Sequence, residues 1–454
     1  MRAKEQIKRL IMFWAKVLII LIQTGMFAWL WYAKLKNLAE IQYWHRGNWA
    51  VIALYFVMIV VFSNAFGGYK VGYLRNWDVI TTQIMAVIVT NGMAYIQLCL
   101  IGNWKLKENL TPILILTGVD IVLVVTWVIL MRWIYANLFP PHQMLMIHGD
   151  ISPDAIMNKL ETRQDRFHIK ETIHINQGVE AVLDKIDEFE VTLIGDIPAH
   201  ERNIFLKYCF ARNIRCYSIP KISDIMITSA ANIELFDSPL MLFRNNGMTA
   251  GQACAKRIMD VVISVIGIIL SSPIMLIIIF AIKLYDHGPV FYKQERLTKD
   301  GAPFQILKFR SMIVDSEKDG ARLASKHDDR ITPVGRVIRR LHFDELPQLF
   351  NVLRGDMAFV GPRPEREEIY AEYEQYIPQF RYRLKMKAGL TGYAQVYGNY
   401  QTVPYDKLKL DLTYIEKFSI WLDIKLIFMT VKILFQKEKS EGVDDNLTTA
   451  MRNE

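Results

Sequence analysis

Two adjacent carboxylates, Asp344 and Glu345, stand among arginines and prolines in the segment LHFDELPQLFNVLRGDMAFVGPRPE, residues 341–365. The pattern predicts a helix from Asp344 that places both carboxylates at its amino end, where the backbone dipole favours the anionic form. A carboxylate held in this way can attack phosphorus, and two adjacent acids can bind Mg²⁺ through hard oxygen ligands. The alternative is that Asp344 only caps the helix, so the surrounding residues have to decide.

Basic residues accompany the acidic pair. A GPRP turn holds Arg363 rigidly, and further arginines lie nearby at Arg336, Arg339, Arg340 and Arg354. Upstream, GPVFYKQERLTKDGAPFQILKFRSM (288–312) predicts short strands around a glycine-containing turn. It clusters Lys293, Arg296, Lys308 and Arg310. Arginine offers a planar fork and lysine a point charge, so these side chains are suited to a diphosphate. A lipid-facing basic collar is the alternative.

The elements that position these residues begin with a membrane region. The chain is 52% hydrophobic and 22% charged, which is typical of a membrane protein with sizeable soluble parts. Four apolar runs are each long enough to cross a bilayer: 11–32, 49–69, 79–102 and 110–138. Basic residues precede the first run, which predicts a retained span with its amino end in the cytoplasm. Asp120 in the fourth run marks a ligand path or, as we favour, a residue that lies near a helix end or faces its bundle neighbours.

Strand and helix patterns alternate after Pro140–Pro141, which predicts a doubly wound parallel sheet over 139–245. The first strand–helix turn, HGDISPDA, holds Gly149 alone instead of G-x-G-x-x-G. We therefore expect a structural or regulatory module rather than a working dinucleotide site.

A fifth apolar run, 256–283, has basic residues at both ends and Ser271-Ser272-Pro273 near its middle. Pro273 removes one backbone donor, and the serine hydroxyls can bond to carbonyls that a bend releases. We expect a re-entrant helix that breaks at Ser272 and Pro273 and returns to the cytoplasmic face. An ordinary fifth span with a proline kink is the alternative.

Charge and cysteine content narrow the class of partner. A formal net charge of +8 suits an anionic lipid surface or a phosphorylated substrate. No nucleic-acid-binding signature is present, so we expect no nucleic acid partner. The four cysteines are scattered and form no CxxC, which favours unpaired thiols.

Residues from about 256 to 436 resemble the bacterial sugar transferase family, the monotopic polyprenyl-phosphate phosphoglycosyl transferases. The matching strings are KRIMD, the SSP break, GPVFYKQER, KFRSM, DELPQLFNVLRGDMAFVGPRP, AGLTGYAQVYG and LDLTYIEKFSIWLDIKLI. Four spans and a nucleotide-binding-like module resemble the large members that start capsule or exopolysaccharide assembly. Ala388, Tyr393 and Tyr397 depart from the residues more usual in relatives, which leaves the identity of the sugar open.

The resemblance implies ping-pong chemistry with a UDP-sugar and undecaprenyl phosphate. Asp344 would attack the β-phosphorus, and Glu345 would support Mg²⁺ binding or proton handling. Lys308, Arg310 and Arg363, with Arg340 and Arg354, would bind the substrate. The product would be undecaprenyl-diphospho-sugar, with UMP released.

The expected protein is thus a membrane protein of α plus α/β class. It comprises a four-helix transmembrane bundle (1–138), a Rossmann-like parallel-sheet module (139–245) and an α+β catalytic domain with a re-entrant membrane helix (250–454). We expect a multi-pass protein of the bacterial inner membrane, with its catalytic domain on the cytoplasmic face and in contact with membrane lipid. The look of the large members favours a homodimer. One alternative is a scaffold with a decayed catalytic domain, although the intact acidic pair argues against it. A nucleotide-sugar epimerase or dehydratase would need a glycine-rich cofactor loop, which the module lacks.

Overall fold

The fold is taken from a computed structural model of the chain. It describes residues 2–38, 45–72, 76–101, 106–150, 153–161, 163, 166–235, 237–243, 247–313, 330–398 and 402–434. The chain divides into two compact units, Met1–Ile219 and Pro220–Glu454. Each unit is described by itself below.

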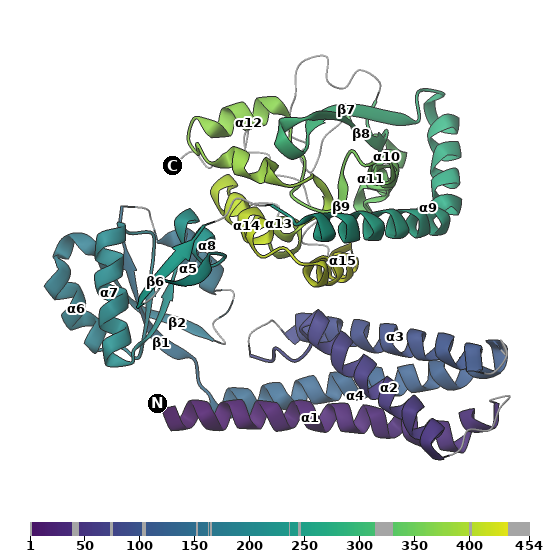
Figure 1. Cartoon of the computed structure of the whole chain (residues 1–454), viewed down its shortest axis with the longest axis horizontal. Coiled ribbons are helices and arrows are strands. Elements are labelled where there is room, and N and C mark those ends of the chain that lie inside the picture. The colour runs from purple at the N-terminus through teal and green to yellow at the C-terminus, as the bar shows by residue number, and fades with distance from the viewer. Residues whose placement is uncertain are drawn as a thin grey trace. The chain divides into compact units, whose positions relative to one another are not determined.

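Four long apolar helices open the first unit: α1 (Arg2–Ala33), α2 (His45–Phe66), α3 (Asn76–Ile101) and α4 (Leu106–Leu138), with a short 3₁₀ turn at Leu35–Leu38 (Figure 1). They share one core, to which they contribute Phe27, Tyr55, Val87 and Val124 in chain order. Asp120 is fully buried within it, and its Oδ2 accepts a hydrogen bond from Asn91 Nδ2 at 3.2 Å. Asp120 therefore faces neighbouring helices, as favoured from the sequence.

The rest of the first unit is a parallel sheet. Its strands are β1 (His142–His148), β2 (Phe167–His174), β3 (Val191–Ile194) and β4 (Arg215–Ser218), in the order β2-β1-β3-β4. Every pair of neighbours in it is parallel, which confirms the parallel-sheet prediction.

Apolar side chains of β1 point alternately to the two faces of the sheet, which explains why helices cover both faces. Leu145 and Ile147 pack with α6 (Val179–Asp187) and α7 (Ala199–Arg212), whereas Met144 and Met146 pack with α5 (Asp154–Glu161). Successive strand side chains point to opposite faces, so each face gains its own core. A 3₁₀ turn, Ile175–Gln177, follows β2.

Gly149 follows β1 where two loops approach each other. A Cβ there would lie 3.1 Å from the carbonyl oxygen of Asp196, so close packing accounts for this glycine.

The second unit begins with α8 (Ile222–Ile227) and the antiparallel hairpin of β5 (Ala231–Leu235) and β6 (Ser238–Leu242). Ile225 of α8 is buried in a core with Leu408 and Leu412 of α14 (Pro404–Glu416). Contacts therefore assign the chain from Pro220 to the second unit, whereas the sequence pattern extends the sheet module to residue 245.

Helix α9 (Ala250–Asp286) is the fifth helix in the described part of the chain that is long and apolar enough to cross a membrane. It contains Pro273 and bends sharply along its length (Figure 1). Proline at 273 leaves the carbonyl of Ile269 without its usual i→i−4 donor. Ser272 Oγ donates to that carbonyl at 2.8 Å, and Ser271 Oγ donates to the carbonyl of Gly267 at 2.6 Å.

The amino-terminal part of α9 is tied to the rest of the unit by the charged residues of KRIMD. Lys256 Nζ donates to the carbonyl of Val360 at 2.9 Å and to Asp423 at 2.6 Å. Arg257 donates to the carbonyls of Val352 and Leu353, both at 2.7 Å. Lys256 and Arg257 therefore bond to other parts of the same unit. The sequence interpretation instead placed this basic pair at the cytoplasmic membrane face.

The remaining elements of the second unit follow α9 in the chain. An antiparallel hairpin comes first, formed by β7 (Phe291–Leu297) and β8 (Pro303–Phe309) around the turn Lys299–Gly301, as the sequence predicts. The elements that follow are α10 (Pro333–Arg340), the 3₁₀ turn η4 (Phe343–Glu345), α11 (Gln348–Arg354), β9 (Ala358–Val360), α12 (Glu367–Glu374), the 3₁₀ segment η5 (Phe380–Lys385), β10 (Gly389–Thr391), α13 (Tyr393–Tyr397), α14 and α15 (Ile420–Leu434). β9 and β10 pair in parallel.

Candidate active site

Asp344 and Glu345 lie on η4, between α10 and α11. The sequence pattern predicts that a helix starts at Asp344, but α11 starts at Gln348 with Pro347 at its N-cap. His342 turns the chain into η4 with a φ of 56°, an uncommon conformation for a residue with a side chain. Asp344 is therefore not the cap of the following helix, and the simple capping explanation for this residue is removed.

Glu345 is held by two cations. Its Oε1 accepts hydrogen bonds from Lys308 Nζ at 2.9 Å and from Arg363 Nη2 at 2.8 Å. Burial opposes ionisation of Glu345, but Arg363 and Lys308 together bring its pKa well below the usual range. Lys308 comes from β8 and Arg363 from the loop after β9, so Glu345 joins two segments that are far apart in sequence.

Asp344 has the opposite electrostatic balance. Burial and the adjacent Glu345 raise its pKa, against the opposing effects of Lys308, Arg339 and His342. The sequence interpretation expected the helix dipole to favour its anion, and the raised pKa differs from that expectation. The two carboxyl groups thus have pKa values displaced in opposite directions, an arrangement typical of sites that divide chemical roles between two acids.

A cleft of about 320 Å³ opens beside Asp344. One part of its wall is charged and comprises Lys308, Arg310, Arg339, Asp344 and Arg366. The other part is largely apolar or aromatic and comprises Pro289, Phe291, Tyr292, Phe309, Met312 and Ile313, with Gln294 and Ser311 between them. A carboxylate facing several cations in a hollow is suited to a ligand with several negative charges.

The structure brings together only some of the basic residues singled out from the sequence. Lys308 and Arg310 line the cleft, and Arg363 bonds to Glu345. Arg310 also forms an ion pair with Asp286, the last residue of α9. Arg340 is exposed on α10, and Arg354 is 66% exposed with Asp356 at 3.6 Å. Neither of these two belongs to the cleft wall.

Sequence reasoning did not select Arg339 and Arg366 as binding residues. In the sequence Arg339 is one of several nearby arginines. The helical periodicity of α10 alone does not show which of its arginines faces the site. Arg366 lies two residues after the GPRP turn, and this closeness was the available signal. Both line the cleft, and Arg339 opposes the rise in the pKa of Asp344.

Glu365 is a second held carboxylate on the same loop. It bonds to Lys407 at 2.6 Å and to Arg296 at 3.4 Å. Burial raises its pKa, but Lys407, Arg383 and Arg296 outweigh this effect and lower the pKa to about 2. Arg296 was grouped with the diphosphate-binding cluster from sequence. Its bond to Glu365 also gives it a role in fixing the loop.

The acidic pair fits a divalent cation in part. Among the residues that the structure describes, no three His, Cys, Asp or Glu side chains are grouped as a metal site. Both cations on Glu345 use Oε1, so its Oε2 and the carboxylate of Asp344 are the hard oxygens that they do not engage. Magnesium commonly binds through one or two carboxylates together with substrate phosphates and water, which this pair can satisfy.

Comparisons with known proteins match the region that contains this site. Residues 251–437 match the family described as Bacterial sugar transferase. Over 262 residues the chain is 38% identical to a UDP-N-acetylgalactosamine-undecaprenyl-phosphate N-acetylgalactosaminephosphotransferase of Aeromonas hydrophila, covering 55% of this chain and 59% of that protein. Over 204 residues it is 43% identical to a UDP-glucose:undecaprenyl-phosphate glucose-1-phosphate transferase of Klebsiella pneumoniae, covering 44% of this chain and 42% of that protein.

A transferase of Caulobacter vibrioides, with the same printed activity as the Klebsiella protein, is 40% identical over 190 residues. The match covers 41% of this chain and 71% of that protein. The chain spans about half the length of the first curated relatives it matches, namely 59% and 42%. The relatives therefore agree with one another in reaction type but differ in the sugar that their names carry.

Proposed function

Because the chain belongs to the bacterial sugar transferase family, we propose that it transfers a sugar-1-phosphate from a UDP-sugar to undecaprenyl phosphate. The products are UMP and undecaprenyl-diphospho-sugar. This is the first membrane step of capsule or exopolysaccharide assembly. The observation that carries the proposal is Asp344 in the wall of a cleft that also presents Lys308, Arg310, Arg339 and Arg366.

The proposed chemistry has two steps at Asp344. A carboxylate oxygen bonds to the β-phosphorus of the UDP-sugar, and the bond from that phosphorus to the bridging oxygen breaks. UMP leaves with the bridging oxygen, and the sugar phosphate stays on Asp344. An oxygen of undecaprenyl phosphate then bonds to the same phosphorus, and the carboxylate of Asp344 leaves.

The other residues of the site stabilise charge and hold geometry. Lys308 and Arg339 face the charge that develops on the phosphoryl oxygens, since both lie close enough to affect the pKa of Asp344. Glu345 keeps Lys308 and Arg363 in place through its two short bonds. Mg²⁺ bound by Asp344 and Glu345 would neutralise part of the diphosphate charge.

We further propose that α9 is re-entrant and that the four apolar helices of the first unit form a transmembrane bundle. In this arrangement the catalytic part stays at the cytoplasmic face of the inner membrane. A lipid phosphate and a water-soluble nucleotide sugar must meet at one plane, and a shallow anchor beside the cleft provides it. A homodimer is also proposed, and the mass of the detergent-solubilised particle measures it.

The proposal is tested by UMP release from a panel of UDP-sugars, using the full chain in nanodiscs with undecaprenyl phosphate and Mg²⁺. We expect release with one sugar and a loss of about 10³-fold or more in Asp344→Asn. Asp300→Asn is the matched control: Asp300 is 77% exposed in the β7–β8 turn at a φ of 58°, which asparagine also adopts. The control should keep full activity.

Two results would count against this proposal. Undiminished release in Asp344→Asn places the nucleophile elsewhere. No release from any sugar by folded wild-type protein favours the scaffold.

A further inference from the structure

Arg363 lies in the segment 360–365. Hydrogen bonds fix the backbone of this segment, because five of its six carbonyls, all but that of Gly361, accept one in the described part of the chain. Val360 O accepts from Lys256 Nζ, and Pro362 O accepts from the amide of Gly389, both at 2.9 Å. Arg363 O accepts from Arg383 Nη2 at 2.9 Å and Pro364 O from Arg296 Nη1 at 3.4 Å. The amide of Leu297 donates to Glu365 O at 3.1 Å.

Three of these donors are charged side chains, and each has a carboxylate partner. Lys256 pairs with Asp423, Arg296 with Glu365 and Arg383 with Asp411. The Arg383–Asp411 pair is the most deeply buried of the three, with side chains 0% and 1% exposed and a distance of 2.7 Å from Nε to Oδ2. Burying a cation costs its hydration free energy unless an opposite charge and well-placed hydrogen bonds compensate for that loss.

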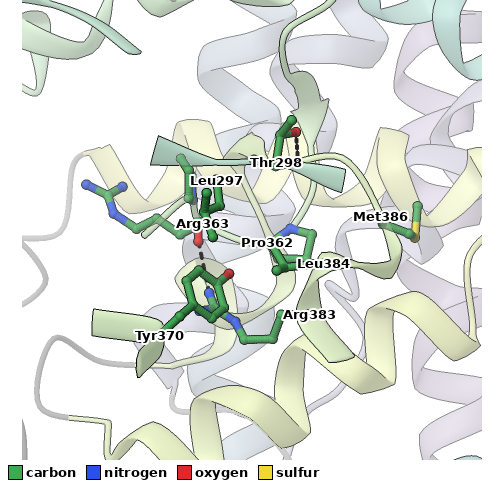
Figure 2. A pocket seen from close by; sticks show the side chains of 10 residues that line it. Leu297, Thr298, Pro362, Arg363, Tyr370, Arg383, Leu384 and Met386 are labelled. Atoms are coloured by element: carbon green, nitrogen blue, oxygen red, sulfur yellow. Dashed lines mark hydrogen bonds between the residues drawn. The ribbon is translucent and has the colours of Figure 1, made fainter. Parts of the chain in front are cut away.

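Arg383 uses the two sides of its guanidinium for two different partners. Nε faces Asp411 on α14, and Nη2 faces the carbonyl of Arg363. Figure 2 shows this second bond, with the side chain of Arg363 extending away from Arg383. The guanidinium also lies 4.9 Å from the ring centre of Phe380. The surrounding hollow has no room for a water molecule, so water does not substitute for these contacts.

We propose that Arg383 is a positioning residue for the transfer reaction and acts through Arg363. Its bond to the backbone of residue 363 sets the point from which the Arg363 side chain reaches Glu345. The Arg363 side chain is 39% exposed and so only partly enclosed by its neighbours, and a fixed backbone helps to keep its guanidinium 2.8 Å from Oε1. This inference rests on the proposed function of the same site.

A lysine at 383 separates positioning from charge. Arg383→Lys keeps a cation for Asp411 but lacks the second arm that reaches Arg363 O. We expect kcat for UMP release to fall about 10- to 100-fold, with a smaller change in KM, because small displacements of a catalytic group have effects of this size. The matched control is Arg381→Gln on the same 3₁₀ segment, where Arg381 is exposed and bonds to Glu367 and Glu374. It should retain wild-type kcat.

A double-mutant cycle shows whether Arg383 acts through Arg363. In an Arg363→Lys background, Arg383→Lys should reduce kcat by less than about twofold, since the residue it positions is already altered. Wild-type kcat in Arg383→Lys, or losses that multiply in the double variant, would overturn the proposal. If Arg383→Lys does not fold, Asp411→Asn takes its place in both comparisons.

Hydrogen exchange of the same proteins keeps this inference separate from the proposed function. Arg383→Lys should speed exchange of the amides of Gly361, Arg363, Glu365 and Arg366 and leave those of the β7–β8 hairpin unchanged. If wild-type protein releases no UMP, the reaction is wrong, but locally faster exchange still supports the fastening role. Unchanged exchange at 361–366 would overturn that role whatever the activity.

Discussion

At the scale of single residues, the two neighbouring acids of the site, Asp344 and Glu345, have different electrostatic environments. Glu345 receives the direct bonds of Lys308 and Arg363, whereas Asp344 experiences these cations only at longer range and feels the charge of Glu345. The raised pKa of Asp344 reflects a less stabilised anion, which is a more basic and more nucleophilic one. The lowered pKa of Glu345 describes a group that stays ionised to hold its partners.

Glu345→Gln should move the pH dependence of the reaction. In the proposed reaction Asp344 must be ionised to attack, so activity should fall as pH drops through its raised pKa. Removing the charge of Glu345 removes a cause of that rise, while Lys308, Arg339 and His342 continue to lower the pKa. The acid limb of the kcat profile should therefore shift to lower pH.

The plateau rate of Glu345→Gln should also fall, by about 10- to 100-fold, because Lys308 and Arg363 lose their anchor. The measurement is UMP release across pH, compared with Asp300→Asn. An acid limb that stays in place or moves to higher pH would contradict the assignment of Asp344 as the titrating nucleophile.

Glu365 makes a separate prediction about stability. Its pKa, lowered from 4.5 to about 2, corresponds to about 3 kcal/mol of stabilisation when it is ionised. A lowered pKa gives stability that is present above the unfolded value and lost as pH falls toward 2. Glu365→Gln should therefore lower Tm at pH 7, and the gap to wild type should narrow below about pH 4.5.

Thermal unfolding in nanodiscs between pH 7 and pH 3 measures this gap, with the exposed Glu368→Gln as control. A constant gap across that range would show that Glu365 contributes through packing alone.

Residue types were predictable here, but their partners were not. The strings DELPQ and GPRP were sufficient to select Asp344, Glu345 and Arg363. Nothing in RYRLKMK separates buried Arg383 from exposed Arg381, because both lie in one 3₁₀ segment without a clear amphipathic period. Likewise Arg340 was chosen ahead of Arg339, although Arg339 is the one in the cleft wall.

At the scale of elements, both ends of α9 are bonded to the part of the second unit that forms the site. Its start is fastened through Lys256, Arg257 and Asp260, the last accepting from the amide of Phe359 at 3.1 Å. Its end is paired through Asp286 to Arg310 in the cleft wall. Pro273 and the hydroxyl of Ser272 between these ends let the helix bend without leaving the carbonyl of Ile269 unpaired.

Pro273→Leu should straighten α9 and change its membrane topology. Leucine restores the amide donor for Ile269 O and lengthens the apolar helix that can cross. Single cysteines on the two sides of the apolar stretch report this change: the native, exposed Cys254, and Lys299→Cys in the β7–β8 turn. In the parent chain both should react with an impermeant maleimide from the cytoplasmic side alone.

In the Pro273→Leu variant, the two cysteines should be labelled from opposite sides, and UMP release should be lost. The conservative Ile274→Leu serves as control, since it leaves the bend intact. Labelling from opposite sides in the parent chain would make α9 an ordinary span and remove the re-entrant proposal.

At the scale of the whole molecule, sequence patterns predicted the classes of element better than their grouping. Apolar run length identified the four long apolar helices α1 to α4 of the first unit, and strand alternation identified the parallel sheet. Both patterns depend only on residues close together in sequence, and for that reason the structure contains the elements that they predict. The grouping of residues 220–243 with the second unit depends on Ile225 reaching α14, a contact nearly 190 residues away in sequence. No local pattern contains that information.

This grouping makes the second unit a candidate for independent activity. The cleft wall, the acidic pair and every fastening bond described here lie between Lys256 and Asp423, inside the unit that starts at Pro220. The match of 190 residues covers 71% of the Caulobacter relative but only 41% of this chain, so that protein carries a transferase name with a match to less than half of this chain. We expect residues 220–454, expressed in membranes, to release UMP with the same sugar preference as the full chain and a kcat within about tenfold.

A fragment that starts at residue 250 lacks α8. Ile225 is then missing from the core that contains Leu408 and Leu412, which should lower Tm by several degrees. Parallel assays of the two fragments distinguish the outcomes. A folded 220–454 fragment without UMP release would show that the first unit is needed for the chemistry itself, and equal stability of the two fragments would show that α8 belongs functionally with the sheet module.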